Sequence, residues 1–236
     1  MIKGVFLDLG WTLLRPVCND WFINQKFLDF VSTDKISSIP TEKWNAVFNK
    51  GIKYLDDNHY VENEDEELIQ YIEFYTILAK KLPELGLSEK QAKEIAEFRT
   101  YDISQYEFFP KARENVLKLK EKYKVGIISD TWPSVERLLQ KGNIADLFDC
   151  KTYSFQLGTF KPDRRMYEDA LLKMGLPAEQ TVFVDDFEGN LDGAAKCGIH
   201  GVLIKTKEQY SVCDPDSGRY PSINAIEELP ELLNKM

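Results

Sequence analysis

Short apolar runs that end in acidic or small polar residues constrain the fold of this 236-residue chain more than any other feature. They are residues 4–7 before Asp8, residues 125–128 before Ser129 and Asp130, and residues 182–184 before Asp185 and Asp186. Uninterrupted apolar runs of this length are typical of strands that are buried on both faces of a parallel sheet. Because open α/β sheets place their chemistry at the carboxyl ends of such strands, the polar residues that follow are candidate site residues.

A further segment, Gly-Thr-Phe-Lys-Pro-Asp at residues 158–163, places Lys161 at the entrance to a predicted helix. Taken alone, each of these residues has a simpler interpretation, because Asp and Ser often occupy turns and helix caps and a lysine is commonly on the surface. The order of the four segments is more specific than any one of them. It resembles the signature of the haloacid dehalogenase superfamily, whose members are mostly magnesium-dependent phosphohydrolases.

The resemblance covers residues 1 to about 14 and about 108 to 205, and all four signature segments are present. The pair Asp185-Asp186 followed by Asn190 is similar to the branch of the superfamily whose first motif reads Asp-Leu-Gly, as residues 8–10 do in this chain. The resemblance implies a doubly wound parallel, Rossmann-like α/β core.

The chain departs from simple α/β alternation after its first predicted strand. Roughly 90 residues of mostly helical pattern come before the next strand, which is too long for an ordinary connection. We therefore predict an α/β core of residues 1–15 plus 108–236 and an inserted α-helical domain of residues 16–107. In the resembled family, an insert at this place is a mobile cap that closes over the site.

Apolar side chains at helical spacing in the insert are expected to form its core rather than a cofactor site. One stripe consists of Trp44, Phe48, Ile52 and Leu55, and another of Leu68, Ile72, Tyr75, Ala79 and Leu82. Ser88 and Gln91 have the spacing of a capping box, which predicts a further helix that begins after Ser88.

The composition argues against several classes of function. The net charge of −9 and the pI near 4.9 disfavour nucleic acid, which is bound through clustered Lys and Arg. Cys18, Cys150, Cys197 and Cys213 have no CxxC spacing, so we expect free thiols and a reducing compartment. No apolar stretch approaches about 18 residues and no charged leader precedes the first strand, so we expect a cytoplasmic protein that binds no membrane. The oligomeric state is left open.

The resemblance implies a magnesium site beside a nucleophile. Asp8 would attack phosphorus and form an aspartyl phosphate. The metal ligands would be Asp8, the Gly10 carbonyl and Asp186, with Asp185 in reach through a water molecule, because magnesium prefers oxygen ligands and keeps several waters. Asn190 would steady the loop.

The remaining motif residues are assigned to the substrate, which the resemblance implies to be a small phosphomonoester such as a sugar phosphate. Ser129 would donate a hydrogen bond to a phosphoryl oxygen, and Lys161 would pair with the phosphate and with Asp8. Trp11 is expected near the entrance, where it either stacks on a sugar or aromatic group or packs against the cap.

Gly10 departs from the family pattern, because most members have a second aspartate at this position that protonates the leaving group and later activates water. Loss of such a group typically costs about 100- to 10,000-fold in rate when the leaving group needs its proton. We therefore hypothesise a substrate with an easily expelled group, such as an anomeric sugar phosphate, an acyl phosphate or an aryl phosphate, or one that provides its own proton.

Asp130 is a second departure, because the family usually has asparagine after the serine. A full negative charge here would repel a bound phosphate. Asp130 is therefore expected either to point away and cap the helix predicted near Pro133, or to have a raised pKa and replace the missing acid beside the substrate.

Two other functions stay open on the sequence alone. A 2-haloacid dehalogenase also lacks the second aspartate, but such enzymes work without metal and use a cap arginine, whereas no arginine occurs between Arg15 and Arg99. A non-catalytic phosphate-binding protein would explain Gly10 but not the retained nucleophile, lysine and carboxylates. Metal dependence separates these functions from the phosphatase that we favour.

Overall fold

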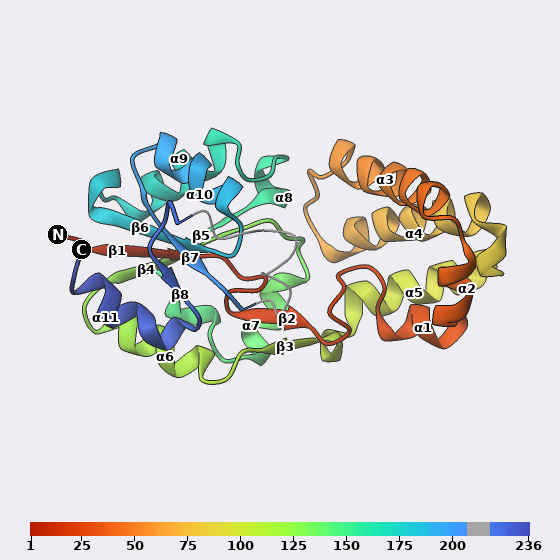
Figure 1. The fold of residues 1–236 in the computed structure, drawn as a ribbon, viewed down its shortest axis with the longest axis horizontal. Coiled ribbons are helices and arrows are strands. Elements are labelled where there is room, and N and C mark those ends of the chain that lie inside the picture. Colours follow the sequence, from red (N-terminus) through yellow and green to blue (C-terminus); the bar gives the residue numbers. More distant parts are fainter. Residues whose placement is uncertain (207–217) are drawn as a thin grey trace. The chain divides into compact units, whose positions relative to one another are not determined.

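The computed structural model describes residues 1–206 and 218–236, which form two compact units. The first unit consists of Met1–Arg15, Phe108–Thr131 and Leu138–Met236, and the second of Pro16–Glu107 and Trp132–Arg137. We call them the α/β unit and the helical unit. Figure 1 shows the sheet with its flanking helices in the α/β unit and the bundle of helices in the helical unit.

The sheet of the α/β unit has, in the described residues, six parallel strands in the order β5-β4-β1-β6-β7-β8. The strands are β1 (Gly4–Leu7), β4 (Lys124–Ser129), β5 (Cys150–Tyr153), β6 (Thr181–Asp185), β7 (His200–Ile204) and β8 (Ser222–Ile223). Every residue of β1 and of β6 is buried, which explains why these runs are apolar throughout rather than alternating. The predicted parallel Rossmann-like core is confirmed.

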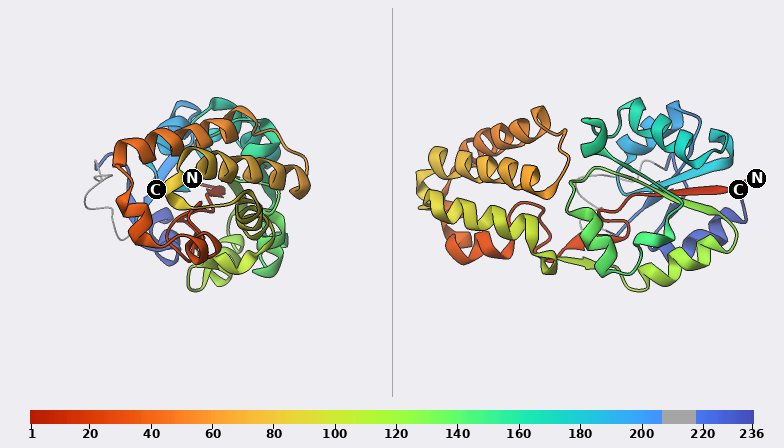
Figure 2. Two further views of the ribbon diagram at one scale, coloured as in Figure 1. Left: turned by 90° about the vertical axis from the view of Figure 1, so that its right-hand side faces the viewer. Right: turned by 180° about the vertical axis from the view of Figure 1, so that it is seen from behind.

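Helices cover both faces of this sheet, as two opposite views of the ribbon show (Figure 1, Figure 2). On one face lie α9 (Arg164–Met174) and α10 (Glu188–Lys196), and on the other α6 (Ala112–Lys120) and α11 (Leu229–Leu233). Phe6 of β1 and Phe183 of β6 are fully buried beneath α9 in one apolar cluster. The short helix α8 (Ser154–Leu157) follows β5.

The helical unit has an apolar core of its own. Its helices are α1 (Gln25–Phe30), α2 (Thr33–Ser38), α3 (Thr41–Asp57), α4 (Glu64–Lys81) and α5 (Glu89–Tyr101). Both predicted stripes contribute to this core, where Tyr71, Phe74 and Leu78 are fully buried. The capping box predicted for Ser88 and Gln91 is present at the start of α5.

Short segments mark the places where the chain passes between the units. β2 (Leu14–Pro16) pairs with β3 (Tyr106–Phe108) in a small separate sheet. The segment Trp132–Arg137, which includes the start of α7 (Val135–Lys141), belongs to the helical unit although it follows β4 in the chain. No sequence pattern had assigned this segment to the insert.

Cys18, Cys150 and Cys197 are free thiols, whereas the fourth cysteine, Cys213, lies outside the described residues. In the part of the chain that the structure describes, no helix is long and apolar enough to cross a membrane.

Substitution of Phe6 by alanine should lower the free energy of unfolding by about 3–5 kcal/mol, because it removes a buried aromatic ring and leaves a cavity at the centre of the sheet. Denaturant titration followed by circular dichroism measures the change. Leu172→Ala on α9 is the control, since Leu172 is 82% exposed and should change stability by less than about 0.5 kcal/mol. Equal effects of the two substitutions would contradict this description of the core.

Candidate active site

The ends of neighbouring strands bring the motif residues together. Asp8 directly follows β1, Ser129 ends β4 and Asp185 ends β6, and β1 pairs with both other strands. The backbone N–H of Asp8 donates to the Val184 carbonyl at 3.0 Å, which fixes the turn after β1 on β6. Asp8, Ser129 and Asp185 are all buried. The predicted convergence of these residues at one edge of the sheet is therefore a feature of the fold.

Lys161 links two of these strand ends. Its Nζ donates to Asp8 Oδ1 at 2.7 Å and to Asp185 Oδ2 at 2.7 Å. The lysine side chain is only 2% exposed, so both ion pairs are shielded from water. The segment before α9, to which Lys161 belongs, is thereby held against β1 and β6.

The same contacts govern the protonation of the pair. Burial raises the pKa of Asp8 to about 6, and the charge of Lys161 limits this rise. Burial disfavours the charged lysine, but the carboxylates of Asp185, Asp8 and Asp130 outweigh it and hold the pKa of Lys161 well above its usual value. The Lys161 charge therefore favours the ionised form of Asp8, which is the form that a nucleophile needs.

Asp185 is held by donors of the protein itself. Its Oδ1 accepts the backbone N–H of Phe187 at 2.8 Å, and the Asn190 amide donates to Oδ1 at 3.1 Å and to Oδ2 at 3.0 Å. Together with Lys161 these donors suit Asp185 to orienting its neighbours rather than to binding a metal directly. The steadying role predicted for Asn190 agrees with these contacts, and a water-mediated contact of Asp185 with magnesium stays a prediction.

The donors at this edge of the sheet fit magnesium in kind. Asp8 and Asp186 are each 6% exposed, and Asp185 is fully buried. The ammonium group of Lys161 is bonded to both Asp8 and Asp185. One positive charge does not balance the three carboxylates of Asp8, Asp185 and Asp186, so the site favours a further cation. Within residues 1–206 and 218–236, no three His, Cys, Asp or Glu side chains lie close enough together to hold a metal ion by themselves. Magnesium here would use one or two carboxylates, the Gly10 carbonyl and water, its common ligand set in proteins.

Asp130 does not cap a helix as predicted. Its Oδ1 accepts the backbone N–H of Lys161 at 3.0 Å, while α7 begins only at Val135, two residues after Pro133. Because a capping side chain bonds the second or third residue of its helix, that interpretation is wrong. Burial raises the pKa of Asp130 to about 7, although Lys161 opposes the rise. The other interpretation, a carboxyl group with a raised pKa, agrees with these contacts.

Gly10 and Trp11 form a tight turn directly after the first motif. Trp11 has a φ of 55°, a left-handed conformation that costs a non-glycine residue about 1–3 kcal/mol. Its N–H donates to the Leu14 carbonyl at 2.7 Å, and its carbonyl accepts the hydroxyl of Thr206. Strain of this kind is concentrated at functional sites, but a contact of the Trp11 ring with substrate stays a prediction.

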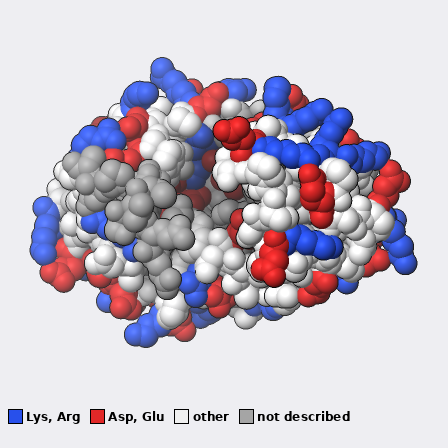
Figure 3. All heavy atoms as spheres, turned by 45° about the vertical axis from the view of Figure 1, so that its right-hand side comes forward, with Lys and Arg blue, Asp and Glu red and all other residues white. Residues whose placement is uncertain are grey.

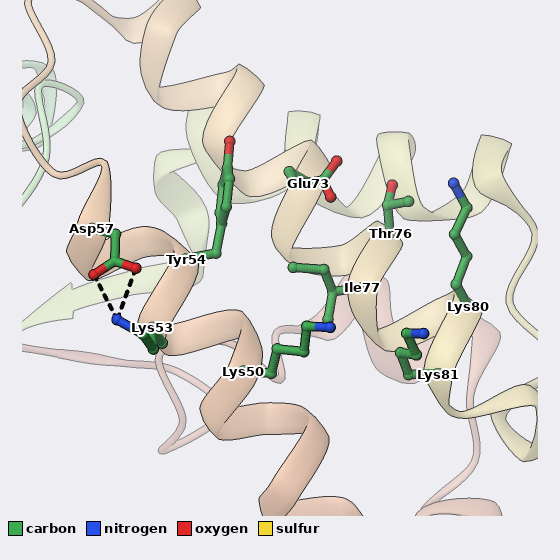
Figure 4. A pocket seen from close by; sticks show the side chains of 9 residues that line it. All are labelled: Lys50, Lys53, Tyr54, Asp57, Glu73, Thr76, Ile77, Lys80 and Lys81. Carbon is green, nitrogen blue, oxygen red and sulfur yellow. Dashed lines mark hydrogen bonds and ion pairs between the residues drawn. The ribbon is translucent and has the colours of Figure 1, made fainter.

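A hollow on the helical unit, between α3 and α4, contains none of the predicted site residues (Figure 4). It has a volume of about 440 Å³. The residues that line it are Lys50, Lys53, Tyr54, Asp57, Glu73, Thr76, Ile77, Lys80 and Lys81. Lys53 is already paired with Asp57 at 2.8 Å, and Lys50, Lys80 and Lys81 are exposed to water. We therefore place the chemistry at the strand ends rather than in this hollow.

Comparisons with known proteins agree with the fold and the motifs. Glyceraldehyde 3-phosphate phosphatase of Methanocaldococcus jannaschii is 24% identical over 245 residues, which cover 100% of this chain and 99% of that protein. The structure of L-2-haloacid dehalogenase from Xanthobacter autotrophicus superposes with a TM-score of 0.67 and 19% identity over 100% of both chains. A phosphatase structure from Thermococcus onnurineus gives 0.63 and 19% over 98% of both. The two structures, at such identity, show the fold alone.

The family model for haloacid dehalogenase-like hydrolases matches residues 2–198, which include β1, β4, β6 and Lys161. Since this match spans most of the chain, we conclude that the protein belongs to the haloacid dehalogenase-like hydrolases.

Proposed function

We propose that this hydrolase is a magnesium-dependent phosphatase of a small phosphomonoester and works through an aspartyl phosphate on Asp8. The observation that carries the proposal is the buried ammonium group of Lys161, 2.7 Å from Asp8 Oδ1 and 2.7 Å from Asp185 Oδ2. A fixed cation beside a carboxylate keeps the nucleophile ionised and offers positive charge to the oxygens of a phosphoryl group. The full-length relative named glyceraldehyde 3-phosphate phosphatase supports this class of substrate.

In the proposed reaction Asp8 attacks phosphorus in line with the leaving oxygen. The bond from phosphorus to that oxygen breaks as the aspartyl phosphate forms, and the leaving oxygen takes up a proton. The Ser129 hydroxyl donates a hydrogen bond to a phosphoryl oxygen, and Lys161 offsets the developing charge. Water then attacks phosphorus, which releases inorganic phosphate and restores Asp8. Magnesium held by Asp8, the Gly10 carbonyl and Asp186 would neutralise the charge that otherwise repels the nucleophile.

The source of the proton for the leaving group shapes the choice of substrate. Gly10 offers no acid, and one oxygen of the Asp130 carboxyl is already bonded to the Lys161 backbone. We therefore propose that the substrate has an easily expelled leaving group, which needs little help from an acid. Glyceraldehyde 3-phosphate, for which the Methanocaldococcus relative is named, is an ester of a primary alcohol and is the natural counter-example to test.

A small metabolite fits the charge of the molecule better than nucleic acid does. Acidic and basic side chains are interspersed on the face in Figure 3, and the chain has a net charge of −9. In the proposal the helical unit is the cap that selects the substrate, the protein is cytoplasmic, and Trp11 lies at the entrance to the site.

A 2-haloacid dehalogenase is the alternative, and it would need a cap arginine for the halide or carboxylate. Arg99 is the first arginine after Arg15, but its guanidinium donates to the Trp21 carbonyl at 3.1 Å and to the Tyr71 hydroxyl at 3.0 Å. It is 6% exposed. We therefore prefer the phosphatase, and halide release is the assay if no phosphate is hydrolysed.

Hydrolysis of an aryl phosphate should need both magnesium and Asp8. Asp8→Asn should lower kcat by at least about 1,000-fold, because an amide cannot form the covalent intermediate, and a chelator should abolish turnover. Asp146→Asn, an exposed aspartate of the α/β unit, should retain full activity. Phosphate release, with and without magnesium, measures all three proteins. Activity that survives chelation or the Asp8 substitution would refute the proposal.

Substrates should rank by the quality of their leaving group. We expect kcat/KM for aryl, acyl and anomeric sugar phosphates to exceed that for glycerol phosphate by about 100- to 10,000-fold, because no side chain at Gly10 protonates the departing oxygen. A panel that also contains glyceraldehyde 3-phosphate measures the ranking. Equal turnover of primary alkyl phosphates would show that another group donates the proton.

Asp130→Asn should increase stability at pH 8 but not at pH 3. The folded-state pKa of Asp130 is raised to about 7 from the usual 3.8, so the stability that its bound proton contributes is present below about pH 4 and lost as pH rises through 7. Asparagine does not titrate and can still accept the Lys161 N–H. We expect a gain of about 1–2 kcal/mol at pH 8, discounted because the carboxyl is partly exposed. Unfolding titrations across this pH range in chelator give the difference, and a flat difference would contradict the shift.

A further inference from the structure

Glu67 of the helical unit is a buried carboxylate that the proposed reaction does not use. It lies in the first turn of α4 and is fully shielded from water. Both of its oxygens accept hydrogen bonds from Ser134, Oε2 from the backbone N–H at 2.8 Å and Oε1 from the hydroxyl at 2.7 Å. Burying a carboxylate costs free energy unless its oxygens accept hydrogen bonds, so Glu67 stabilises the position of Ser134 that supplies both bonds.

Arg137 anchors the same segment a second time. Its guanidinium pairs with Glu64 Oε2 at 3.0 Å and donates to the carbonyls of Thr100 and Tyr101, each at 2.8 Å. These carbonyls lie at the C-terminal end of α5, where a helix favours a positive charge. The segment Trp132–Arg137 is therefore bonded to the start of α4 and to the end of α5.

Trp132 fixes the beginning of the segment through its ring. The ring packs edge-on against His59 with centroids 4.8 Å apart and lies 5.5 Å from the ring of Tyr71. His59 and Tyr71 are both buried. Packing against side chains of the helical unit thus begins at Trp132, only three residues after Ser129 in the chain.

The stretch before this segment is held by the α/β unit. The Thr131 N–H donates to Ser154 Oγ at 2.8 Å, and Ser154 Oγ donates to the Thr131 carbonyl at 3.1 Å. Asp130 is bonded to the backbone of Lys161. A single peptide link, from Thr131 to Trp132, joins the two anchored stretches, so only residues 130–133 separate Ser134 from Ser129 in the chain.

We propose that Glu67 is a positioning residue for Ser129. By holding Ser134, it fixes the segment that follows β4 and thereby the direction in which the Ser129 hydroxyl points. The inference rests on the proposed function, in which Ser129 binds a phosphoryl oxygen. Its consequence is that α4 contributes to phosphate binding through the main chain without supplying a side chain to the phosphate.

Amide hydrogen exchange of the full chain tests the positioning without any substrate. Glu67→Ala should speed exchange of the peptide covering residues 129–134 by at least about tenfold, because the buried acceptor of two hydrogen bonds is lost. Glu67→Gln retains an acceptor for the N–H and a donor for the hydroxyl, so it should exchange at nearly the wild-type rate. Glu73→Ala, an exposed glutamate of the same helix, should leave this peptide unchanged. Unaltered exchange in Glu67→Ala overturns the proposal.

A double-mutant cycle tests whether Glu67 acts through Ser129. Glu67→Ala should lower kcat/KM for an aryl phosphate by about tenfold in the wild type, but by less than about twofold in a Ser129→Ala background. Glu67→Gln should restore most of the loss. Two losses that simply multiply would mean that Glu67 acts by another route, and would overturn the proposal.

Ser134→Ala serves if Glu67→Ala does not fold. It removes only the hydroxyl bond and keeps the backbone N–H, so it should raise exchange and lower kcat/KM in the same direction by about threefold. If the wild type hydrolyses no phosphate with magnesium, the proposed function fails, while the exchange of residues 129–134 still decides the positioning role.

Discussion

The ion pairs of Lys161 with Asp8 and Asp185 are the interaction on which the site depends. The two carboxylates lie at or directly after the ends of adjacent parallel strands, β1 and β6, and both are buried. Without the ammonium group between them, they would repel each other in a medium that screens charge poorly. Loss of the lysine would therefore disturb the end of the sheet as well as any reaction there. The order of the strands thus brings the two carboxylates together, and the charge of Lys161 is what allows both to be buried there.

The backbone of the same lysine also bonds Asp130, which stands where the family usually has asparagine. Its N–H binds one oxygen of the Asp130 carboxyl, and burial raises the pKa of that group to about 7. A carboxyl with a pKa near neutrality carries only part of its charge, so it repels a bound phosphate less than an ordinary aspartate would. The loop before α9 therefore connects the ends of β1, β4 and β6 through one residue, Lys161.

The helical unit is more than an insert with its own core. Its helices pack around Tyr71, Phe74 and Leu78, as the apolar stripes predicted, but it also contains Trp132–Arg137 from beyond β4. Glu67 holds Ser134 of that segment through two hydrogen bonds shielded from water, and the Arg137 guanidinium donates to carbonyls at the end of α5. The chain from Trp132 onward, three residues after Ser129, is therefore part of the unit that we propose as the cap.

Local signals in the sequence determined the buried strands, the position of the site and the start of one helix. Apolar runs specified the buried strands, the residues that end them marked the site, and Ser88 with Gln91 marked the start of α5, because each signal comes from neighbouring residues. Only the tertiary structure decided that Asp130 bonds Lys161, 31 residues away, and that Glu67 bonds Ser134, 67 residues away. Such contacts have no periodic or motif signature, since they form only when the packing of distant elements removes the same polar groups from water.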